Sequence, residues 1–301
     1  MITRVTNQGL MVTAQRNLQQ SLSQLSKIQN TAGTLKRIDQ PSDDPSGTAD
    51  SLRIRAEQAS TSQYARNIND GNSWLSIADT ALSRTNELMK KVRDLTVQGA
   101  NDGALSPLQK EAIAVELETI RSELMTTANT EYLGRNIFAG NSTAGVAFTD
   151  SNAVPPALPY TSTSTGSIVE RRIGTNTTIR VDADGVAAFG EGDASMFKLV
   201  DNIIADLRSG VNVNARLDEI DTRSSAILGQ LGAVGARQAQ VLKAQGANMS
   251  ESVSLEAQRA EIEDVDLGQA ILDLKAQELN YQAALSVTSR ALQQNLMDFL
   301  R

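Results

Sequence analysis

Two short acidic clusters are the places where the sequence could bind a metal ion or perform acid–base chemistry. Asp182, Asp184 and Gly185 resemble the start of a calcium-binding loop, but the following positions do not continue its pattern of ligands. Asp43 and Asp44 lie between two prolines, as turn residues and helix caps commonly do. We interpret the first cluster as a hairpin turn and the second as turn and cap residues. The sequence therefore predicts no metal site and no cofactor.

The remaining sequence lacks the residues that most enzymes use. It contains no cysteine and no histidine, which excludes disulfides, thiol nucleophiles, imidazole catalysis and Cys or His metal ligands. Gly229, Gly232 and Gly235 are spaced by three inside a helical pattern, so we interpret them as a point of close helix approach and not as a dinucleotide-binding loop. Trp74, the only tryptophan, lies beside an apolar seam, where we expect it to pack. We predict that the protein is not an enzyme.

Composition favours long helices over a compact catalytic domain. Of the 301 residues, 40% are hydrophobic but only 3% are aromatic, which suits helices packed through aliphatic seams. The net charge is −7 without a dense basic block, so nucleic acid is a disfavoured partner. The N-terminus has no signal-peptide pattern, and no window is apolar enough to span a membrane. We expect a protein that is cytoplasmic or exported without a cleaved signal, and not inserted in a membrane.

The two ends of the chain carry matching apolar seams. From Val265 to Arg301 large apolar residues recur at steps of three and four, and the first forty residues have the same spacing. A lone pair of helices cannot bury both seams, so we expect other subunits to cover them. The residues expected at this subunit interface are Leu18, Leu22, Leu25, Leu267, Ile271, Leu274, Leu285, Leu292 and Phe299.

Between these ends the sequence predicts an inner helical bundle and a β-rich insert. Helical spacing runs from about Thr48 towards Gly99, resumes after a Ser106–Pro107 cap, and returns from Ser195 to Ile262. The glycine-, serine- and threonine-rich stretch between predicts short strands. The expected fold class is mainly α, an elongated coiled-coil bundle formed by both halves of the chain with a small β-rich inserted domain. Its expected domains are a terminal domain (1–40 and 265–301), an inner bundle (41–145 and 195–264) and a surface insert (146–194).

Several sequence motifs resemble the flagellin family. The stretch from Asn69-Asp70-Gly71 to Val92-Arg93-Asp94-Leu95 and Ala100-Asn101 is similar to the inner domain of flagellins. Four motifs are closer to the family's hook-filament junction proteins, namely RVTNQ (4–8), SDDP (42–45), WLS (74–76) and GRNIFAG (134–140). The resemblance covers roughly 1–145 and 196–301 and is weak across the insert.

This resemblance implies a structural protein of the bacterial flagellum that forms the junction between hook and filament. Such a protein is secreted by the flagellar type III apparatus and assembles as a ring of copies. Its implied partners are the other junction protein on the hook side, flagellin on the filament side and a cytoplasmic export chaperone. For the chaperone, the resemblance points to Leu274, Tyr281, Leu285 and Leu292.

Two other functions stay open on the sequence alone. One is a flagellin filament subunit, and the other is a coiled-coil tip or translocator protein of a type III secretion system.

Overall fold

The computed structural model describes residues 7–101, 105–150, 160–164 and 166–299. The chain divides into two compact units: unit 1 comprises Met1–Ser60 and Glu251–Arg301, and unit 2 comprises Thr61–Ser250. Unit 1 therefore combines the two ends of the sequence, and unit 2 is the continuous stretch between them. Among the described residues, no helix is both long enough and apolar enough to cross a membrane.

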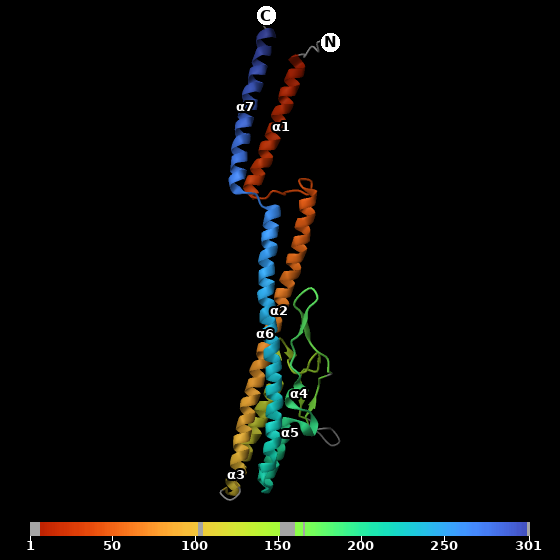
Figure 1. Ribbon diagram of the computed structural model, residues 1–301, viewed down its shortest axis with the longest axis vertical. Coiled ribbons are helices and arrows are strands. Elements are labelled where there is room, and N and C mark those ends of the chain that lie inside the picture. Colours follow the sequence, from red (N-terminus) through yellow and green to blue (C-terminus); the bar gives the residue numbers. More distant parts are fainter. Residues whose placement is uncertain (1–6, 102–104, 151–159, 165, 300–301) are drawn as a thin grey trace. The chain divides into compact units, whose positions relative to one another are not determined.

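Long helices make up most of the described chain (Figure 1). Both ends and the inner stretches are helical, as the apolar spacing predicts. The helices are α1 (Asn7–Thr34), α2 (Pro45–Gly99), α3 (Pro107–Ala128), α4 (Gly185–Phe189), α5 (Met196–Ser209), α6 (Leu217–Glu263) and α7 (Leu267–Phe299), with 3-10 turns at Gly192–Ala194 and Val213–Arg216.

Unit 2 contains the main hydrophobic core, formed by seams that repeat every seven residues. On α2 one line of seam residues is buried throughout, and α6 contributes a second line to the same core. The α2 line is Ile68, Leu75, Leu82, Met89 and Thr96, and the α6 line is Ile220, Ile227, Val234 and Val241.

α3 begins at the predicted cap and joins this core. Ser106 and Gln109 form a capping box, with Pro107 in the first turn. Arg84 of α2 pairs with Glu123 of α3 at 2.9 Å, so the two consecutive helices lie together, as the sequence predicts.

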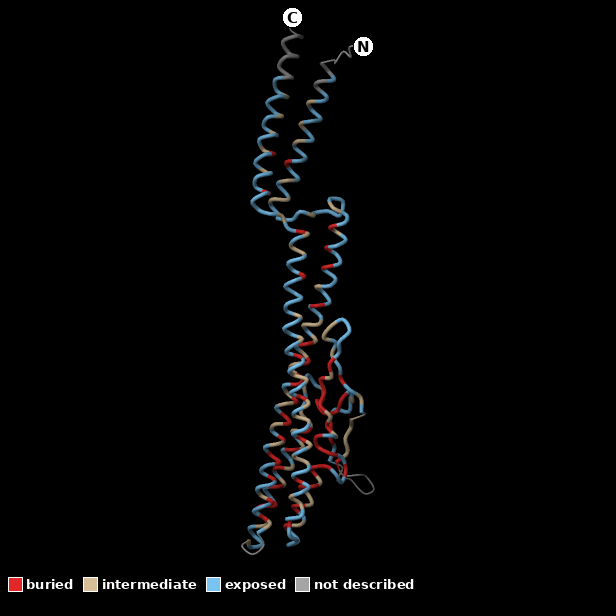
Figure 2. The backbone as a smooth tube through the Cα atoms, viewed as in Figure 1, coloured by how far each residue is buried: buried red, intermediate tan, exposed pale blue. Residues whose placement is uncertain are grey.

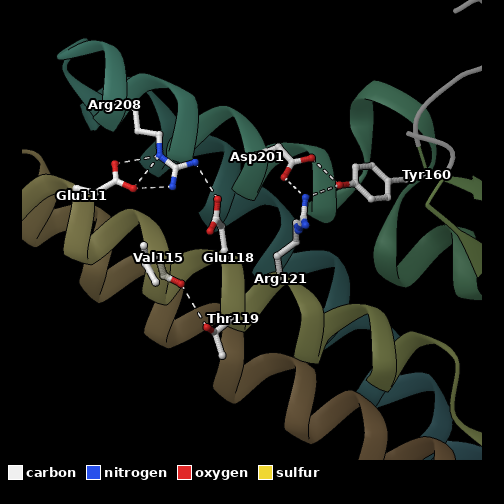
Figure 3. Close-up of polar contacts among 8 residues, drawn as sticks. All are labelled: Glu111, Val115, Glu118, Thr119, Arg121, Tyr160, Asp201 and Arg208. Carbon is white, nitrogen blue, oxygen red and sulfur yellow. Dashed lines mark hydrogen bonds and ion pairs between the residues drawn. The ribbon is translucent and has the colours of Figure 1, made fainter. Parts of the chain in front are cut away.

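Polar contacts then fix α3 against α5 (Figure 3). Arg208 of α5 pairs with Glu111 at 2.7 Å and with Glu118 at 2.8 Å. Further along, Arg121 of α3 pairs with Asp201 of α5 at 2.6 Å, and the Tyr160 hydroxyl donates to the same carboxylate at 2.5 Å. Burial, together with this hydrogen bond, raises the pKa of Tyr160, which therefore stays a neutral donor.

The region between α3 and α5, which includes the insert, contains small antiparallel strand pairs. The β-branched runs SIVERRI (167–173) and TTIRV (177–181) supply one pair, in which Glu170 faces Arg180. The strands are β1 (Glu131–Tyr132) with β2 (Arg135–Asn136), β3 (Phe148–Thr149) with β4 (Thr161–Ser162), and β5 (Glu170–Arg172) with β6 (Thr178–Arg180). Strands of two or three residues form few ladder hydrogen bonds, so side-chain packing must hold this region.

Aromatic side chains provide that packing. Four of the five phenylalanines in the sequence are buried here with Tyr160, and the rings of Phe138 and Phe189 lie 4.9 Å apart, edge to face. The remaining members of this aromatic cluster are Phe148 and Phe197. The low aromatic content of the chain is thus concentrated where secondary structure is weakest.

The predicted hairpin turn at Asp182–Gly185 is wrong. Asp184 caps the short helix α4 by accepting from the backbone N–H of Ala187 at 3.0 Å. The buried Asp182 pairs with Arg180 at 2.8 Å and accepts from the backbone N–H of Val169. Both carboxylates therefore fix the local backbone, which the turn-like composition alone did not reveal.

The Asn69–Gly71 motif lies within α2, which continues through it as one helix, and its residues contact the insert. Asp70 pairs with Arg171 at 2.6 Å, and a Cβ at Gly71 would lie 3.1 Å from Val181. Trp74, one turn on, is buried, and the guanidinium carbons of Arg135 and Arg171 lie 5.7 and 5.8 Å from its ring centroid. The expected packing role of Trp74 is confirmed.

Candidate assembly interface

Unit 1 joins the two ends of the chain through backbone contacts at the base of α1 and α7 (Figure 1). The N–H of Val265 donates to Leu35 O at 3.1 Å, and the N–H of Arg37 donates to Glu263 O at 2.7 Å. From this base α1 and α7 pack along each other.

An ion pair between a buried carboxylate and an exposed arginine strengthens the same base. Glu263 of α6 accepts two hydrogen bonds from Arg55 of α2, at 2.9 and 2.8 Å, and a further one from the Ser51 hydroxyl. The hydrogen bond from Arg55 is the main reason why the pKa of Glu263 falls to about 2. Glu263 is therefore ionised at every physiological pH.

The predicted roles of Asp43 and Asp44 as turn and cap residues are confirmed. Asp44 accepts from the backbone N–H of Gly47 at 2.9 Å at the start of α2, and Asp43 pairs with Lys27 of α1 at 2.7 Å. These contacts position the loop that connects α1 to α2.

The face of α7 that contacts α1 is smaller and more polar than its leucine seam predicts. Ala270 and Gln277 are its buried residues in the described part, and Gln277 donates to the backbone oxygen of Ser21 at 3.2 Å. On the α1 side Leu25 is buried. The ends do meet, but the α7 face in contact with α1 is offset from the predicted line of leucines, because Ala270 and Gln277 allow a closer approach and a hydrogen bond.

This offset divides the predicted interface residues into three groups. Leu25 is buried, and Leu18 and Leu274 are half-buried, as is Tyr281, which the resemblance assigns to chaperone binding. Exposed positions are Leu22, Leu267, Ile271 and Leu285. The side chains of Leu292 and Phe299 lie outside the described residues, although both positions belong to α7.

Further large apolar side chains of α7 are exposed beside these residues. Leu272 and Leu279 widen the seam, and Val287 lies further along the same helix. On α1, Leu22 lines a groove of about 500 Å³ between the helix and the Asp39–Asp43 loop. Figure 2 shows how little of α1 and α7 is buried. Such an exposed apolar surface can bind other helices.

Comparison with known families agrees with this architecture. Residues 5–143 match the model of the bacterial flagellin N-terminal helical region, and residues 217–300 match that of the C-terminal helical region. The insert lies between the two matches.

Curated relatives include filament and hook-associated proteins. Polar flagellin F of Vibrio parahaemolyticus is 31% identical over 140 residues, which are 46% of this chain and 37% of that protein. The flagellar filament 33 kDa core protein of Treponema phagedenis is 25% identical over 296 residues, 96% of each chain. Flagellar hook-associated protein 3 of Salmonella typhimurium is 25% identical over 224 residues, 70% of this chain and 68% of the relative.

Solved structures share the fold. A flagellar hook-associated protein from Vibrio parahaemolyticus aligns over 74% of this chain and all of its own, with a TM-score of 0.67 and 22% identity. Hook-associated protein-3 from Legionella pneumophila aligns over 70% of this chain and 99% of its own, with a TM-score of 0.61 and 15% identity. Both terminal helical regions of flagellin are thus present around a small insert, and the chain belongs to the bacterial flagellin family.

Proposed function

We propose that this chain is the protein that joins the hook to the filament of a bacterial flagellum. The observation that carries the proposal is the set of large aliphatic side chains that the α1–α7 pair leaves exposed on α7, beginning with Leu267 and Ile271. The likeness to hook-associated protein 3, which extends over 70% of the chain, supports a role at the junction.

Assembly, and not catalysis, is the proposed activity. Full burial of one leucine side chain contributes about 1.5–3 kcal/mol, so several exposed leucines on one helix supply a strong driving force for packing against neighbouring helices. The proposed domains keep the sequence-based bounds: a terminal domain (1–40 and 265–301), an inner bundle (41–145 and 195–264) and an insert (146–194).

Each copy would present different faces to its two neighbours, and the proposed partners follow from this difference. One face would bind the other junction protein on the hook side, the opposite face would bind flagellin, and the copies would close into a ring. We infer that the chain leaves the cell through the flagellar type III apparatus and ends in the extracellular flagellum.

An export chaperone would have to compete with α1 for part of α7. Leu274 and Tyr281 are half-buried on the side of α7 where Gln277 contacts α1, whereas Leu285 is exposed. A chaperone that grips all three side chains, with Leu292, would therefore hold α7 away from α1 until export.

The interface proposal predicts the effect of Leu285→Asp. Because Leu285 is exposed, the variant should stay a soluble, folded monomer, while a carboxylate in a helix interface should abolish junction assembly. Motility and filament attachment in a strain that produces only this variant provide the measurement. Gln282→Asp, an exposed polar position on the same helix, is the matched control and should swim normally. Normal filament growth with Leu285→Asp would contradict the proposed interface.

A filament subunit is the second candidate, favoured by the alignment with the Treponema filament core protein over 96% of each chain. An epitope tag inserted at the exposed Thr143–Gly145 segment distinguishes the two candidates. Antibody labelling confined to the hook-proximal end of the filament supports the junction, whereas labelling along the whole filament supports the subunit and overturns our first proposal.

A further inference from the structure

One face of α6 in unit 2 is uncharged, exposed and regularly spaced. We call it the α6 outer stripe; it consists of Leu228, Gly232, Gly235, Ala239, Leu242, Gly246 and Met249. Its members follow each other at steps of three and four, on a side of the helix away from the buried Val234 and Val241. Between residues 225 and 250, all of which the structure describes, Lys243 is the only exposed charged residue.

No packing contact within the described chain requires a glycine at these positions of the stripe. A Cβ added at Gly232, Gly235 or Gly246 would meet no atom within 4 Å, and the same holds for Gly229 beside the stripe. The sequence-based interpretation that Gly229, Gly232 and Gly235 mark a close approach between helices is therefore wrong within one copy. Glycine weakens a helix relative to alanine, so four open glycines in one helix indicate that something outside the chain approaches the backbone there.

A second uncharged stripe lies on α3 in the same unit. This α3 outer stripe consists of the exposed residues Leu108, Ala112, Val115, Thr119, Ser122 and Thr126. Figure 3 shows Val115 and Thr119 directed away from α5, opposite the side chains that pair with Arg208 and Asp201. By contrast, the exposed face of α2 in this unit is charged, with Arg84, Glu87, Lys90, Lys91 and Arg93.

The two stripes are complementary in charge and in length. Lys243 is the exposed charged residue beside the α6 stripe, and Glu116 is an exposed charged residue between members of the α3 stripe. The other three glutamates of α3 pair within the chain, Glu111 and Glu118 with Arg208 and Glu123 with Arg84. At 1.5 Å per residue the α3 stripe is about 27 Å long and the α6 stripe about 32 Å long. Pairing two α6 stripes would oppose like charges, and pairing α3 with α6 would not.

We propose that the α3 outer stripe of one copy packs against the α6 outer stripe of the next. Because the two stripes differ, the contact is head-to-tail, and its repetition builds a ring where the rotation between copies closes. The inference rests on the proposed function and adds to it a second interface, in unit 2, with a defined partner surface.

Cysteine cross-linking tests this contact directly, since the natural chain has no cysteine. Val115→Cys is combined in one chain with a cysteine at Gly235, Ala239, Leu242 or Gly246, and flagella isolated from cells that produce only this chain are oxidised. At least one pair should shift most of the protein into a ladder of multimers longer than the dimer. Val115→Cys combined with Lys90→Cys on α2, and each single cysteine alone, should stay monomeric.

Dimers from a single cysteine would show that identical stripes pair and would overturn the proposal. If antibody labelling finds the protein at the junction but no cysteine pair gives a ladder, this inference is overturned and the proposed function stands. If labelling does not find the protein at the junction, the proposed function itself is overturned. Where the cysteines prevent assembly, charge reversal provides a second measurement. A chain with Lys243→Glu should no longer assemble at the junction. Adding Glu116→Lys to the same chain should restore assembly. Failure of that rescue would contradict the α3–α6 contact.

Discussion

At the scale of single residues, Glu263 links stability to pH. Its pKa lies near 2 in the folded chain, against 4.5 for the unfolded group, mainly because Arg55 donates to it. The stabilising contribution is therefore complete above about pH 4.5 and is lost as the pH falls towards 2. Glu263→Gln should lower the free energy of unfolding by about 1–3 kcal/mol at pH 7, because Arg55 loses its charged acceptor.

Urea unfolding followed by circular dichroism measures this difference. The gap between the natural chain and Glu263→Gln should narrow as the pH is lowered from 5 to 3. Glu261→Gln, at an exposed position of the same helix, should change little. A gap that stays constant across this pH range would mean that the ionised Glu263–Arg55 pair is not its source.

Gly232→Ala tests whether a glycine of the α6 outer stripe lowers the stability of the single copy. Because a Cβ there meets nothing within 4 Å, Gly232→Ala should raise the free energy of unfolding of the isolated chain by about 0.5–1 kcal/mol. Gly71→Ala should gain less or lose stability, since its Cβ would lie 3.1 Å from Val181. Denaturant unfolding of both variants checks the contrast, and a destabilised Gly232→Ala would mean that α6 is more tightly packed there than described.

At the scale of elements, the start of α3 depends on two local hydrogen bonds. The N–H of Ser106 donates to Gln109 Oε1 at 2.8 Å, and the Ser106 hydroxyl accepts from the N–H of Gln109. Ser106→Ala should lower the free energy of unfolding by about 1 kcal/mol, whereas Ser106→Asp, which keeps the acceptor, should stay near the natural value. Thermal unfolding of the two variants makes the comparison, and equal losses would exclude the cap as the cause.

Helices could be predicted from the sequence more reliably than their contacts. A seven-residue line such as Ile68, Leu75 and Leu82 identifies both a helix and its buried face, because the core of unit 2 covers it. The seam of α7 identifies a helix but not the face towards α1, since Ala270 and Gln277 carry that contact and the leucines remain outside. Apolar spacing predicts that a helix face is buried, but it does not identify the neighbouring element that buries it.

The insert was predictable in outline only. Its β-branched runs form β5 and β6, but α4 and the aromatic cluster depend on contacts between residues far apart in sequence, such as Phe148 with Phe197. No local pattern encodes such contacts, which is why Asp184 suggested a turn and in fact caps a helix.

At the scale of the whole molecule, buried residues are unevenly divided between the two units. The large core of buried residues lies in unit 2, whereas in the described parts of α1 and α7 the buried residues are Leu25, Ala270 and Gln277. Local opening costs less free energy where fewer apolar side chains are buried. The α1–α7 pair should therefore open far more often than the helices of unit 2.

Limited proteolysis of the purified monomer measures this difference with sites of matched exposure. Lys275 of α7 and Lys243 of α6 are both exposed on helices, so trypsin can cut either only after local opening. Cleavage at Lys275, and at Lys27 of α1, should precede cleavage at Lys243 and leave a resistant core of about residues 40–265. Equal rates at Lys275 and Lys243 would mean that the α1–α7 pair is stable without neighbours. Its exposed leucines would then no longer require other subunits, and the chain would be better explained as a stand-alone helical protein.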